Sequence, residues 1–232
     1  MKVLCLDCGN TRVKWGLRHG QEWLESGVAT YGELPSLSVS ADRLLVCNVA
    51  GERGRLAVQS LADRLARSVE WVRAQGQQCG VVNGYDHPEQ LGADRWAALI
   101  AARQLRSGSS LVVNAGTATT IDLLTADGTF PGGLILPGLA LMRESLVAAT
   151  ADLPPGGGEF RDLPTNTFDA IISGVMAATL GAIERQFRQI DRQPDPLCLL
   201  SGGNALLLKP HLNIACRHEP DLVLIGLATI AG

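Results

Sequence analysis

The chain has 232 residues, 46% of them hydrophobic and 19% charged, and its formal net charge is -3. That length and apolar content suffice for one large domain or two compact ones, each with its own core. The small net charge excludes a broad basic field of the kind that attracts nucleic acid or anionic lipid. We therefore expect no nucleic-acid or membrane partner, and any anion must be bound by local groups.

The first residues and the cysteines indicate a cytoplasmic protein. The opening apolar run is interrupted by Asp7, which makes it too short for a signal peptide, and no later stretch reaches about 18 uninterrupted apolar residues. Cys5 and Cys8 form a C-x-x-C, but no second Cys pair or His pair stands at zinc-site spacing. Cysteines scattered through apolar runs are typical of buried reduced thiols. The six are Cys5, Cys8, Cys47, Cys79, Cys198 and Cys216.

Short strands and helices alternate along the first half of the chain. Two apolar runs, 2–7 and 12–17, are joined by the turn Cys8-Gly9-Asn10-Thr11 and predict a β-hairpin. An Ala- and Leu-rich segment predicts a helix that begins near Ala93 and ends at 107–110. The other predicted elements are strands over 44–49 and 70–74 and a helix over 55–69.

The second half begins in the same way as the first. A buried strand, a Gly turn and a second strand follow one another again, and Asp127-Gly128 makes the next turn. When LDCGNTRVKWGL is laid on VNAGTATTIDLL, both have a polar residue two positions before Gly9 or Gly116. We predict two similar α/β halves, 1–110 and 111–232, although a Gly turn between strands is common enough to arise by chance.

The rest of the second half keeps the α/β pattern. Its predicted elements are a Pro- and Gly-punctuated stretch over 131–150, a mobile surface loop over 153–167, a helix over about 167–190, a strand entering a Gly turn over 197–208 and a closing helix over 222–231.

The two Gly turns are candidates for binding phosphate. A Gly turn lets the backbone approach a phosphate, and neighbouring hydroxyl and amide groups add donors. Neither turn is G-x-x-x-x-G-K-[ST] or a G-x-G-x-x-G that opens a helix, so the P-loop and Rossmann sites are excluded on spacing. The alternative is that the polar side chains only satisfy turn amides or are β-branched strand residues. The candidate donors are Asn10, Thr11, Thr117, Thr119 and Thr120.

Four charged residues extend this hypothesis. Asp7 ends a buried strand, where a carboxylate could hold Mg²⁺ against phosphates, and Lys14 could add a point charge. Asp94 and Arg95 lie at a helix start, where Asp94 could accept a hydroxyl proton and Arg95 could bind a carboxylate. On position alone, a helix-start Asp with a surface Arg is the simpler interpretation of this pair.

The ordered motifs resemble those of type III pantothenate kinases along essentially the whole chain. That family belongs to the acetate and sugar kinase, chaperone ATPase and actin superfamily. The resemblance therefore implies duplicated actin-like ATPase (ribonuclease H-like) α/β halves with the nucleotide cleft between them. The motifs are Asp7-Cys8-Gly9-Asn10-Thr11, Gly92-Ala93-Asp94-Arg95, Asn114-Ala115-Gly116-Thr117-Ala118-Thr119-Thr120, Gly132-Gly133 with Pro137-Gly138, Asn166-Thr167 and Ser201-Gly202-Gly203.

The resemblance also implies a reaction and its residues. The reaction is transfer of the ATP γ-phosphoryl group to the 4'-hydroxyl of pantothenate, the first step of coenzyme A biosynthesis, with Mg²⁺ on the phosphates. Asp94 would be the catalytic proton acceptor, and Arg95 would bind the pantothenate carboxylate. The implied ATP-binding residues are Asp7, Cys8, Gly9, Asn10, Thr11, Arg12, Val13, Lys14 and Thr117. The implied substrate-binding residues are Tyr85, Gly92, Ala93, Asp94, Arg95 and Thr167.

One position departs from the family pattern. The second loop of the family usually begins with an Asp that binds a monovalent cation such as K⁺ or NH₄⁺, and Asn114 stands there. A unit charge at 4 Å is worth about 4 kcal/mol at an effective dielectric near 20. The cation is therefore expected to bind more weakly, and activation by potassium is in doubt. The family is also dimeric, and the apolar helices after Pro137 and Thr167 are candidates for a homodimer interface.

Two other functions fit parts of the same pattern. A sugar or amino-sugar kinase of the same superfamily would use a similar phosphate site, because the phosphate site does not dictate the acceptor. A nucleotide-sensing regulator would keep the fold without turnover, and Asn114 is compatible with that. The retention of Asp7, Asp94 and Arg95 favours the pantothenate kinase.

Overall fold

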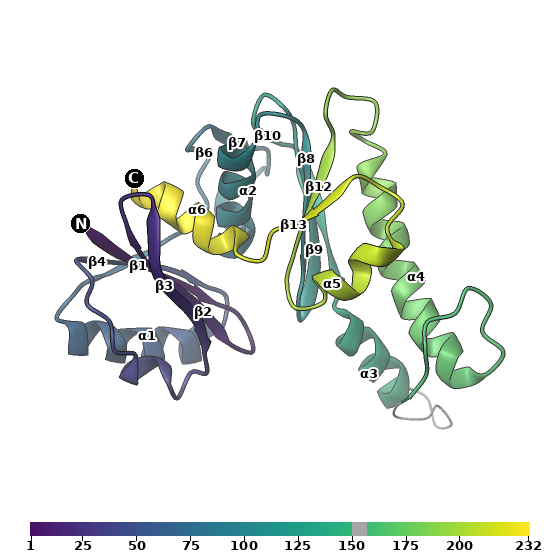
Figure 1. Cartoon of the computed structure of the whole chain (residues 1–232), viewed down its shortest axis with the longest axis horizontal. Coiled ribbons are helices and arrows are strands. Elements are labelled where there is room, and N and C mark those ends of the chain that lie inside the picture. Colours follow the sequence, from purple (N-terminus) through teal and green to yellow (C-terminus); the bar gives the residue numbers. More distant parts are fainter. Residues whose placement is uncertain (150–156) are drawn as a thin grey trace. The chain divides into compact units, whose positions relative to one another are not determined.

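Figure 1 shows the computed structural model of the chain, which describes residues 1–149 and 157–232. The chain divides into two compact units. The first unit comprises Met1–Ser107, Asp127–Pro131 and Asp221–Gly232, and the second comprises Gly108–Ala126 and Gly132–Pro220. These units differ from the predicted halves, 1–110 and 111–232, because two later segments return to the first unit.

The first unit is built on a five-stranded sheet in the order β3-β2-β1-β4-β5. β1 pairs antiparallel with β2 and parallel with β4, so it lies at the centre of the sheet. Its sequence KVLCLDC is a nearly continuous apolar run, as expected of a strand that is covered on both faces. The bounds are β1 (Lys2–Cys8), β2 (Val13–His19), β3 (Glu22–Ala29), β4 (Arg43–Asn48) and β5 (Val69–Trp71).

Helices cover the two faces of this sheet (Figure 1). On one face α1 (Gly51–Leu65) buries Val58 and Leu61 against Leu4 and Leu6 of β1. On the other face α6 (Leu222–Ala231) packs against β1 and against α2 (Ala93–Leu105). The two helices approach closely, since a Cβ at Gly226 would lie 1.9 Å from the Ala97 carbonyl oxygen. The predicted start of α2 and the bounds of α6 are confirmed, and α1 begins four residues before the predicted 55.

The remaining elements of the first unit are short. Three of them form a second sheet in the order β10-β7-β6, in which β10 comes from the segment Asp127–Pro131. The strand β3 was not expected from the sequence, because it is exposed along nearly its whole length and shows no apolar alternation. The short elements are η1 (Leu34–Ser36), η2 (Pro88–Gln90), β6 (Gln77–Gln78), β7 (Val81–Asn83) and β10 (Thr129–Phe130).

The second unit repeats the sheet of the first. Its strand order is β11-β9-β8-β12-β13, with β8 pairing antiparallel with β9 and parallel with β12. β1 ends at Cys8 and β8 ends at Ala115, which confirms the predicted repetition at an offset of 107 residues. The bounds are β8 (Ser110–Ala115), β9 (Ala118–Leu124), β11 (Gly132–Pro137), β12 (Leu197–Ser201) and β13 (Cys216–His218).

The main helix of the second unit is α4 (Thr167–Phe187), which is long and apolar enough to cross a membrane by length and composition alone. One side of α4 is buried in the core of the second unit, as is typical of a core helix. The core residues on that side include Met176, Leu180 and Ile183. Asn166 caps its start, with the side-chain oxygen accepting from Asp169 N at 3.0 Å. The other helices are α3 (Leu139–Ala149), α5 (Ala205–Leu208) and η3 (Lys209–His211).

The predicted loop over 153–167 is described in part. Residues 153–156 lie outside the described residues, so the prediction is untested there. Residues 157–166 form no helix or strand. The predicted end of the following helix at 190 is three residues too late, because α4 ends at Phe187 and turns follow it.

Candidate active site

The turn between β1 and β2, called here the first loop, runs from Gly9 to Arg12. Gly9 N donates to Arg12 O at 3.2 Å, which closes the turn. The Tyr31 hydroxyl donates to Gly9 O at 2.5 Å, and the Arg53 guanidinium donates to Asn10 O. Arg53 also lies 4.4 Å from the centre of the Tyr31 ring. Two side chains from other parts of the chain therefore stabilise the backbone of the loop. Sequence reasoning missed both of them.

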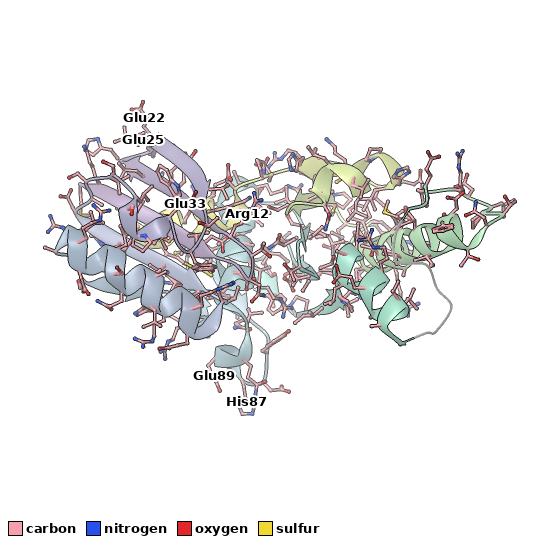
Figure 2. All side chains as sticks on the ribbon, turned by 90° about the horizontal axis from the view of Figure 1, so that it is seen from below. Arg12, Glu22, Glu25, Glu33, His87 and Glu89 are labelled. Atoms are coloured by element: carbon pink, nitrogen blue, oxygen red, sulfur yellow. The ribbon has the colours of Figure 1, made fainter. Side chains whose placement is uncertain are left out.

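Tyr31 is suited to its role as a donor. Burial raises the pKa of Tyr31 to about 12, so its hydroxyl keeps the proton that it donates. Arg12 is a neighbour of Glu33 (Figure 2). The pKa of Glu33 is lowered by hydrogen bonds from Thr30 and, to a smaller extent, by the Arg12 charge. No motif could have revealed Tyr31 or Arg53, because each lies far from the loop in the sequence.

Asp7 stands directly before the first loop, near the end of β1. Its cross-strand neighbours are Lys14 on β2 and Cys47 on β4. Burial and the charge of Asp94 raise the pKa of Asp7 to about 7, and Lys14 opposes that shift. The carboxyl groups of Asp7 and Asp94 therefore belong to one site, although 87 positions separate them in the sequence. The Lys14 ammonium lies 3.8 Å from an Asp221 carboxylate oxygen.

The raised pKa of Asp7 makes stability depend on pH. An unfolded Asp has a pKa of about 3.9, so between about pH 4 and 7 the folded chain binds more protons than the unfolded chain. The stability from this group is full below about pH 4 and is lost as pH rises through about 7. We expect Asp7→Asn to raise the free energy of unfolding at pH 8 by on the order of 1–3 kcal/mol. Urea denaturation at pH 5 and pH 8 measures it, and Asp162→Asn, at an exposed position, is the control.

A gain in Asp162→Asn equal to that in Asp7→Asn would contradict the burial of an Asp7 charge. An equal gain at pH 5 and pH 8 would contradict the pKa shift itself.

Asp94 lies in the first turn of α2, where the helix dipole favours a negative charge. Its carboxylate accepts from Arg95 N at 2.8 Å. Burial nonetheless raises the pKa of Asp94, against that hydrogen bond and the Arg95 charge. A Cβ at Gly92 would lie 2.6 Å from Asp94 Oδ1, so the glycine leaves room for the carboxylate. Gly92, Ala93 and Asp94 thus lie together where α2 begins.

Arg95 is only 5% exposed, which contradicts the interpretation as a surface arginine. Its Nη1 donates to the Tyr85 hydroxyl oxygen at 3.0 Å. The guanidinium carbon lies 5.7 Å from the centre of the Tyr85 ring and 5.9 Å from that of Phe130. The two rings are 5.2 Å apart. Tyr85 and Arg95 are therefore neighbours, as their joint assignment to a substrate pocket requires.

Phe130 was missed by sequence reasoning. It is fully buried and comes from the segment that returns to the first unit. A Cβ at Gly84 would lie 2.4 Å from Phe130 O, so glycine at this position lets the two backbones approach. The glycine directly before Tyr85 indicated a close approach of another backbone segment. The sequence did not indicate that this segment contains Phe130.

The second loop, Gly116 and Thr117, is the tighter counterpart of the first. Gly116 N donates to Ala118 O at 3.0 Å, and Gly138 N donates to Thr117 O at 2.9 Å. A Cβ at Gly138 would lie 2.2 Å from Gly116 O. The Pro137-Gly138 motif therefore supports the second loop, which is a specific reason for its glycine.

The Gly202-Gly203 pair supports the same loop from β12. Gly202 has φ +94°, and a Cβ there would lie 2.5 Å from Ala115 O. Asn204 N donates to Ala115 O at 2.9 Å, and its side-chain amide donates to Gly116 O at 3.4 Å. Gly202 is thus needed for the approach of two backbones, whereas Gly203 is open to solvent.

The three threonines of the second motif differ in position. Thr117 is exposed on the loop, while Thr119 and Thr120 lie on β9 with buried side chains. Thr119 Oγ1 has no hydrogen-bond partner among the described residues. The expectation that Thr119 and Thr120 act as phosphate donors is wrong, because their side chains are buried within the β9 sheet. Asn114 lies on β8, one residue before its end, and pairs with Thr120. Thr167 is the exposed first residue of α4 in the second unit.

The cysteines correct one expectation. Cys5, Cys8, Cys47 and Cys198 are buried free thiols as predicted, but Cys79 is exposed and Cys216 is partly exposed. Within residues 1–149 and 157–232, no three His, Cys, Asp and Glu side chains are grouped to hold a metal. Asp7 and Asp94, whose charges disfavour each other, are the acidic pair of this site and fit a cation with further ligands from a substrate.

Comparisons with known proteins identify the family of this chain. A family model described as type III pantothenate kinase matches residues 3–189. A type III pantothenate kinase of Aromatoleum aromaticum is 46% identical over 235 residues, which cover 99% of this chain and 97% of the relative. Many further relatives bear the same name, among them one of Dechloromonas aromatica at 43% identity over 99% of this chain and 98% of the relative.

Solved structures identify the fold. A protein described as a 2-dehydro-3-deoxygalactonokinase from Sinorhizobium meliloti has a TM-score of 0.63 at 15% identity, covering 99% of this chain and 98% of that chain. At such identity the likeness shows the fold alone, which is that of actin-like ATPases and sugar kinases, as predicted. The match of the family model and the identity to its named relatives together show that this chain belongs to the type III pantothenate kinase family.

Proposed function

We propose that this chain is a pantothenate kinase that transfers the ATP γ-phosphoryl group to the 4'-hydroxyl of pantothenate, the first step of coenzyme A biosynthesis. Its family membership supports the reaction. The observation that carries the proposal is the pairing of Asp7 and Asp94 beside a Gly loop, with Arg95 next to Asp94. This brings a phosphate loop, a proton acceptor and a carboxylate-binding group into one unit.

Residues of each loop are proposed to bind ATP. Backbone amides of the first loop and the exposed Thr117 hydroxyl serve the phosphates, since amide and hydroxyl donors bind oxyanions without bringing charge. Lys14 adds a positive charge near Asp7. The residues proposed to bind ATP are Asp7, Cys8, Gly9, Asn10, Thr11, Arg12, Val13, Lys14 and Thr117.

Mg²⁺ accompanies ATP in kinases, and Asp7 is the residue proposed to hold it. When bound, the ion neutralises charge on the phosphates. The surroundings of Asp7 fit that role, because burial and the Asp94 charge both disfavour the ionised carboxylate of Asp7. A positive charge beside Asp7 would restore its usual ionisation.

Asp94 is the proposed proton acceptor. A general base works best when its pKa lies near the working pH, and burial moves the pKa of Asp94 upward in that direction. The hydrogen bond from Arg95 N fixes one carboxylate oxygen at the helix start. In this proposal a carboxylate oxygen of Asp94 takes the proton of the attacking 4'-hydroxyl.

Arg95 is the proposed ligand of the pantothenate carboxylate. The other residues proposed to bind pantothenate are Tyr85, Gly92, Ala93, Asp94 and Thr167. We expect Arg95→Lys to raise KM for pantothenate at least about tenfold and to leave KM for ATP nearly unchanged, because lysine keeps the charge but loses the two-pronged guanidinium. Steady-state kinetics with each substrate varied in turn measure both constants.

Arg95 also donates to the Tyr85 hydroxyl, so Tyr85→Phe measures separately what the loss of this contact does. It removes the hydroxyl that Arg95 binds and keeps the ring. An equal rise of both KM values in Arg95→Lys would contradict a carboxylate ligand and indicate general damage to the site.

The decisive experiment for the function is a coupled phosphorylation assay with pantothenate, run beside a panel of sugars and amino sugars. We expect ATP consumption only with pantothenate and a product that carries one phosphate on the 4'-hydroxyl. Turnover of a sugar instead would indicate a sugar kinase, and ATP binding without turnover of any acceptor would indicate a regulator.

The same assay repeated in Na⁺, K⁺ and NH₄⁺ tests the cation. We propose that a monovalent cation binds weakly beside Asn114, because an amide oxygen carries only a partial charge. Asn114→Asp restores the carboxylate. A stronger dependence on K⁺ in that variant than in the natural chain supports the proposal, and equal dependence contradicts it.

We also propose that the protein is a cytoplasmic homodimer. Exposed apolar side chains gather on β11, α3 and α4 of the second unit, and none of the residues of α3 is buried. Such surfaces are typical of interfaces in soluble proteins. The exposed residues are Leu134, Ile135, Leu141, Leu146 and Phe168.

Light scattering after size-exclusion chromatography tests the dimer. We expect the natural chain to be dimeric at micromolar concentration and Leu141→Glu to be monomeric, because a carboxylate would be desolvated at the interface. Leu56→Glu, at an exposed leucine of α1, is the control and should stay dimeric. A monomeric natural chain, or equal behaviour of both variants, would contradict this interface.

A further inference from the structure

Two cysteines of the second unit face each other across neighbouring strands. Cys198 on β12 and Cys216 on β13 are direct partners in a parallel pair. Backbone hydrogen bonds on both sides hold this register, from Cys198 N to Ala215 O at 2.8 Å and from Glu219 N to Leu200 O at 2.9 Å. Paired strands lie about 4.8 Å apart, within the range of about 4.4–6.8 Å between Cα atoms that a disulfide spans.

The two thiols are not equivalent. Cys198 is fully buried and Cys216 is partly exposed at the last strand of the sheet. Cys198 is therefore shielded behind its partner, and Cys216 is the thiol that solvent reaches. The neighbouring Cys198 thiol lowers the pKa of Cys216, against burial and with a smaller contribution from the Lys209 charge. Cys216 is thus the accessible, nucleophilic member, and Cys198 lies within reach behind it.

The other cysteines lack this combination. Cys5, Cys8 and Cys47 are buried, and burial raises the pKa of each thiol. Cys79 is exposed, but burial of its sulfur still raises its pKa. A thiolate rather than a thiol attacks an oxidant. Among the described cysteines, Cys216 therefore has both the access and the thiolate character for such a reaction.

We propose that Cys216 and Cys198 are an oxidant-sensitive modification site that reacts with peroxides to form an intramolecular disulfide. The Cys216 thiolate attacks one oxygen of hydrogen peroxide and breaks the O–O bond, which gives a sulfenic acid and hydroxide. Cys198 then attacks the Cys216 sulfur, the S–O bond breaks and water leaves. The two sulfurs supply the two electrons that reduce the peroxide, and the two thiol protons end in two water molecules.

The site is connected to the second loop through one strand. β12 carries Cys198 and continues through Ser201 to Gly202, whose backbone contacts Ala115 at the start of the loop. A cross-link between β12 and β13 therefore acts on the strand that positions this contact. A change in KM for ATP on oxidation is a secondary expectation and rests on the proposed function, whereas the disulfide itself does not.

Peptide mass spectrometry of the full chain tests the proposal. The folded protein is treated with a small excess of hydrogen peroxide, remaining thiols are blocked with N-ethylmaleimide, and peptides are mapped without reduction. We expect one linked peptide pair joining Cys198 to Cys216, two hydrogens lighter than the separate peptides, and its loss on treatment with dithiothreitol. Oxidation first at Cys79, or no linked pair while the protein stays folded, would overturn the proposal.

Variants separate the two roles. In Cys198→Ser and Cys198→Ala the sulfenic acid of Cys216 has no partner, so dimedone should label Cys216. Cys216→Ser should abolish the linked pair, and Cys79→Ser should leave it unchanged. In the untreated natural chain, iodoacetamide should alkylate Cys216 at least about tenfold faster than Cys79. This last measurement needs no variant to fold, and equal rates at the two cysteines would overturn the nucleophilic role of Cys216.

Discussion

Replacement of Asp94 by Asn should lower kcat at least about a hundredfold and leave ATP binding almost unchanged. General-base assistance is typically worth about 10² to 10⁴ in rate, and an amide cannot take the proton of the attacking hydroxyl. Asparagine keeps the shape of the side chain and an oxygen that can still accept from Arg95 N, as Asp94 does at 2.8 Å. The start of α2 should therefore stay in place, so that the loss falls on the chemical step.

Steady-state kinetics with pantothenate and calorimetric titration with ATP measure the two effects separately. Glu89→Gln is a matched control, because Glu89 is an exposed acidic residue on η2, paired with His87 at 3.6 Å (Figure 2). It should leave kcat unchanged. A kcat in Asp94→Asn within tenfold of the natural value would remove Asp94 from the role of base.

The same variant has a second readout at Asp7. After burial, the negative charge of Asp94 is the next cause of the raised pKa of Asp7. With that charge removed, the pKa of Asp7 should move down from about 7. Carboxyl NMR titration follows this change without any substrate, so it separates the coupling of the two groups from the catalytic role.

The local part of the fold could be predicted from the sequence, because hydrophobic period and Gly turns are local signals. The β1–β2 hairpin, the start of α2 and the strand leading to Gly202 were all predicted this way. The repetition of the sheet was predicted from two such turns at an offset of 107 residues. These features depend on residues that are close together in the sequence.

Contacts between distant segments could not be predicted. Phe130 reaches Tyr85 only because β10 joins the sheet of β7. Tyr31 and Arg53 reach the first loop from η1 and α1 regions that carry no phosphate motif. Thr119 and Thr120 looked like loop donors because a motif cannot show that β9 starts at Ala118. Tertiary packing decides each case.

Glycine positions illustrate the same limit. Gly202 and Gly203 are adjacent and look equivalent in the sequence, yet a Cβ at Gly202 would lie 2.5 to 2.7 Å from three backbone atoms of Ala115. A Cβ at Gly203 would meet nothing within 4 Å. The difference comes from the path of β8, which carries Ala115 and lies beside β12. The same substitution, glycine to alanine, therefore meets a crowded backbone at Gly202 and open space at Gly203.

We expect Gly202→Ala to displace the second loop and to raise KM for ATP at least about tenfold, whereas Gly203→Ala leaves it unchanged. An L-residue in the left-handed region costs about 1–2 kcal/mol, and the backbone of Ala115 must also move. Since about 1.4 kcal/mol corresponds to tenfold in an equilibrium, that strain suffices for the expected change. The variant can relieve it by withdrawing from Ala115, which removes the bond from Asn204 N to Ala115 O.

Calorimetric ATP titration and thermal unfolding of both variants test this expectation. In Gly202→Ala, weaker ATP binding should accompany a lower midpoint of unfolding, because Ala115 is buried in the core of the second unit. KM for pantothenate should change less, since most of the residues proposed to bind it, among them Tyr85, Asp94 and Arg95, belong to the first unit. Equal ATP affinity in Gly202→Ala and Gly203→Ala would show that the contact with Ala115 does not position the second loop for the nucleotide.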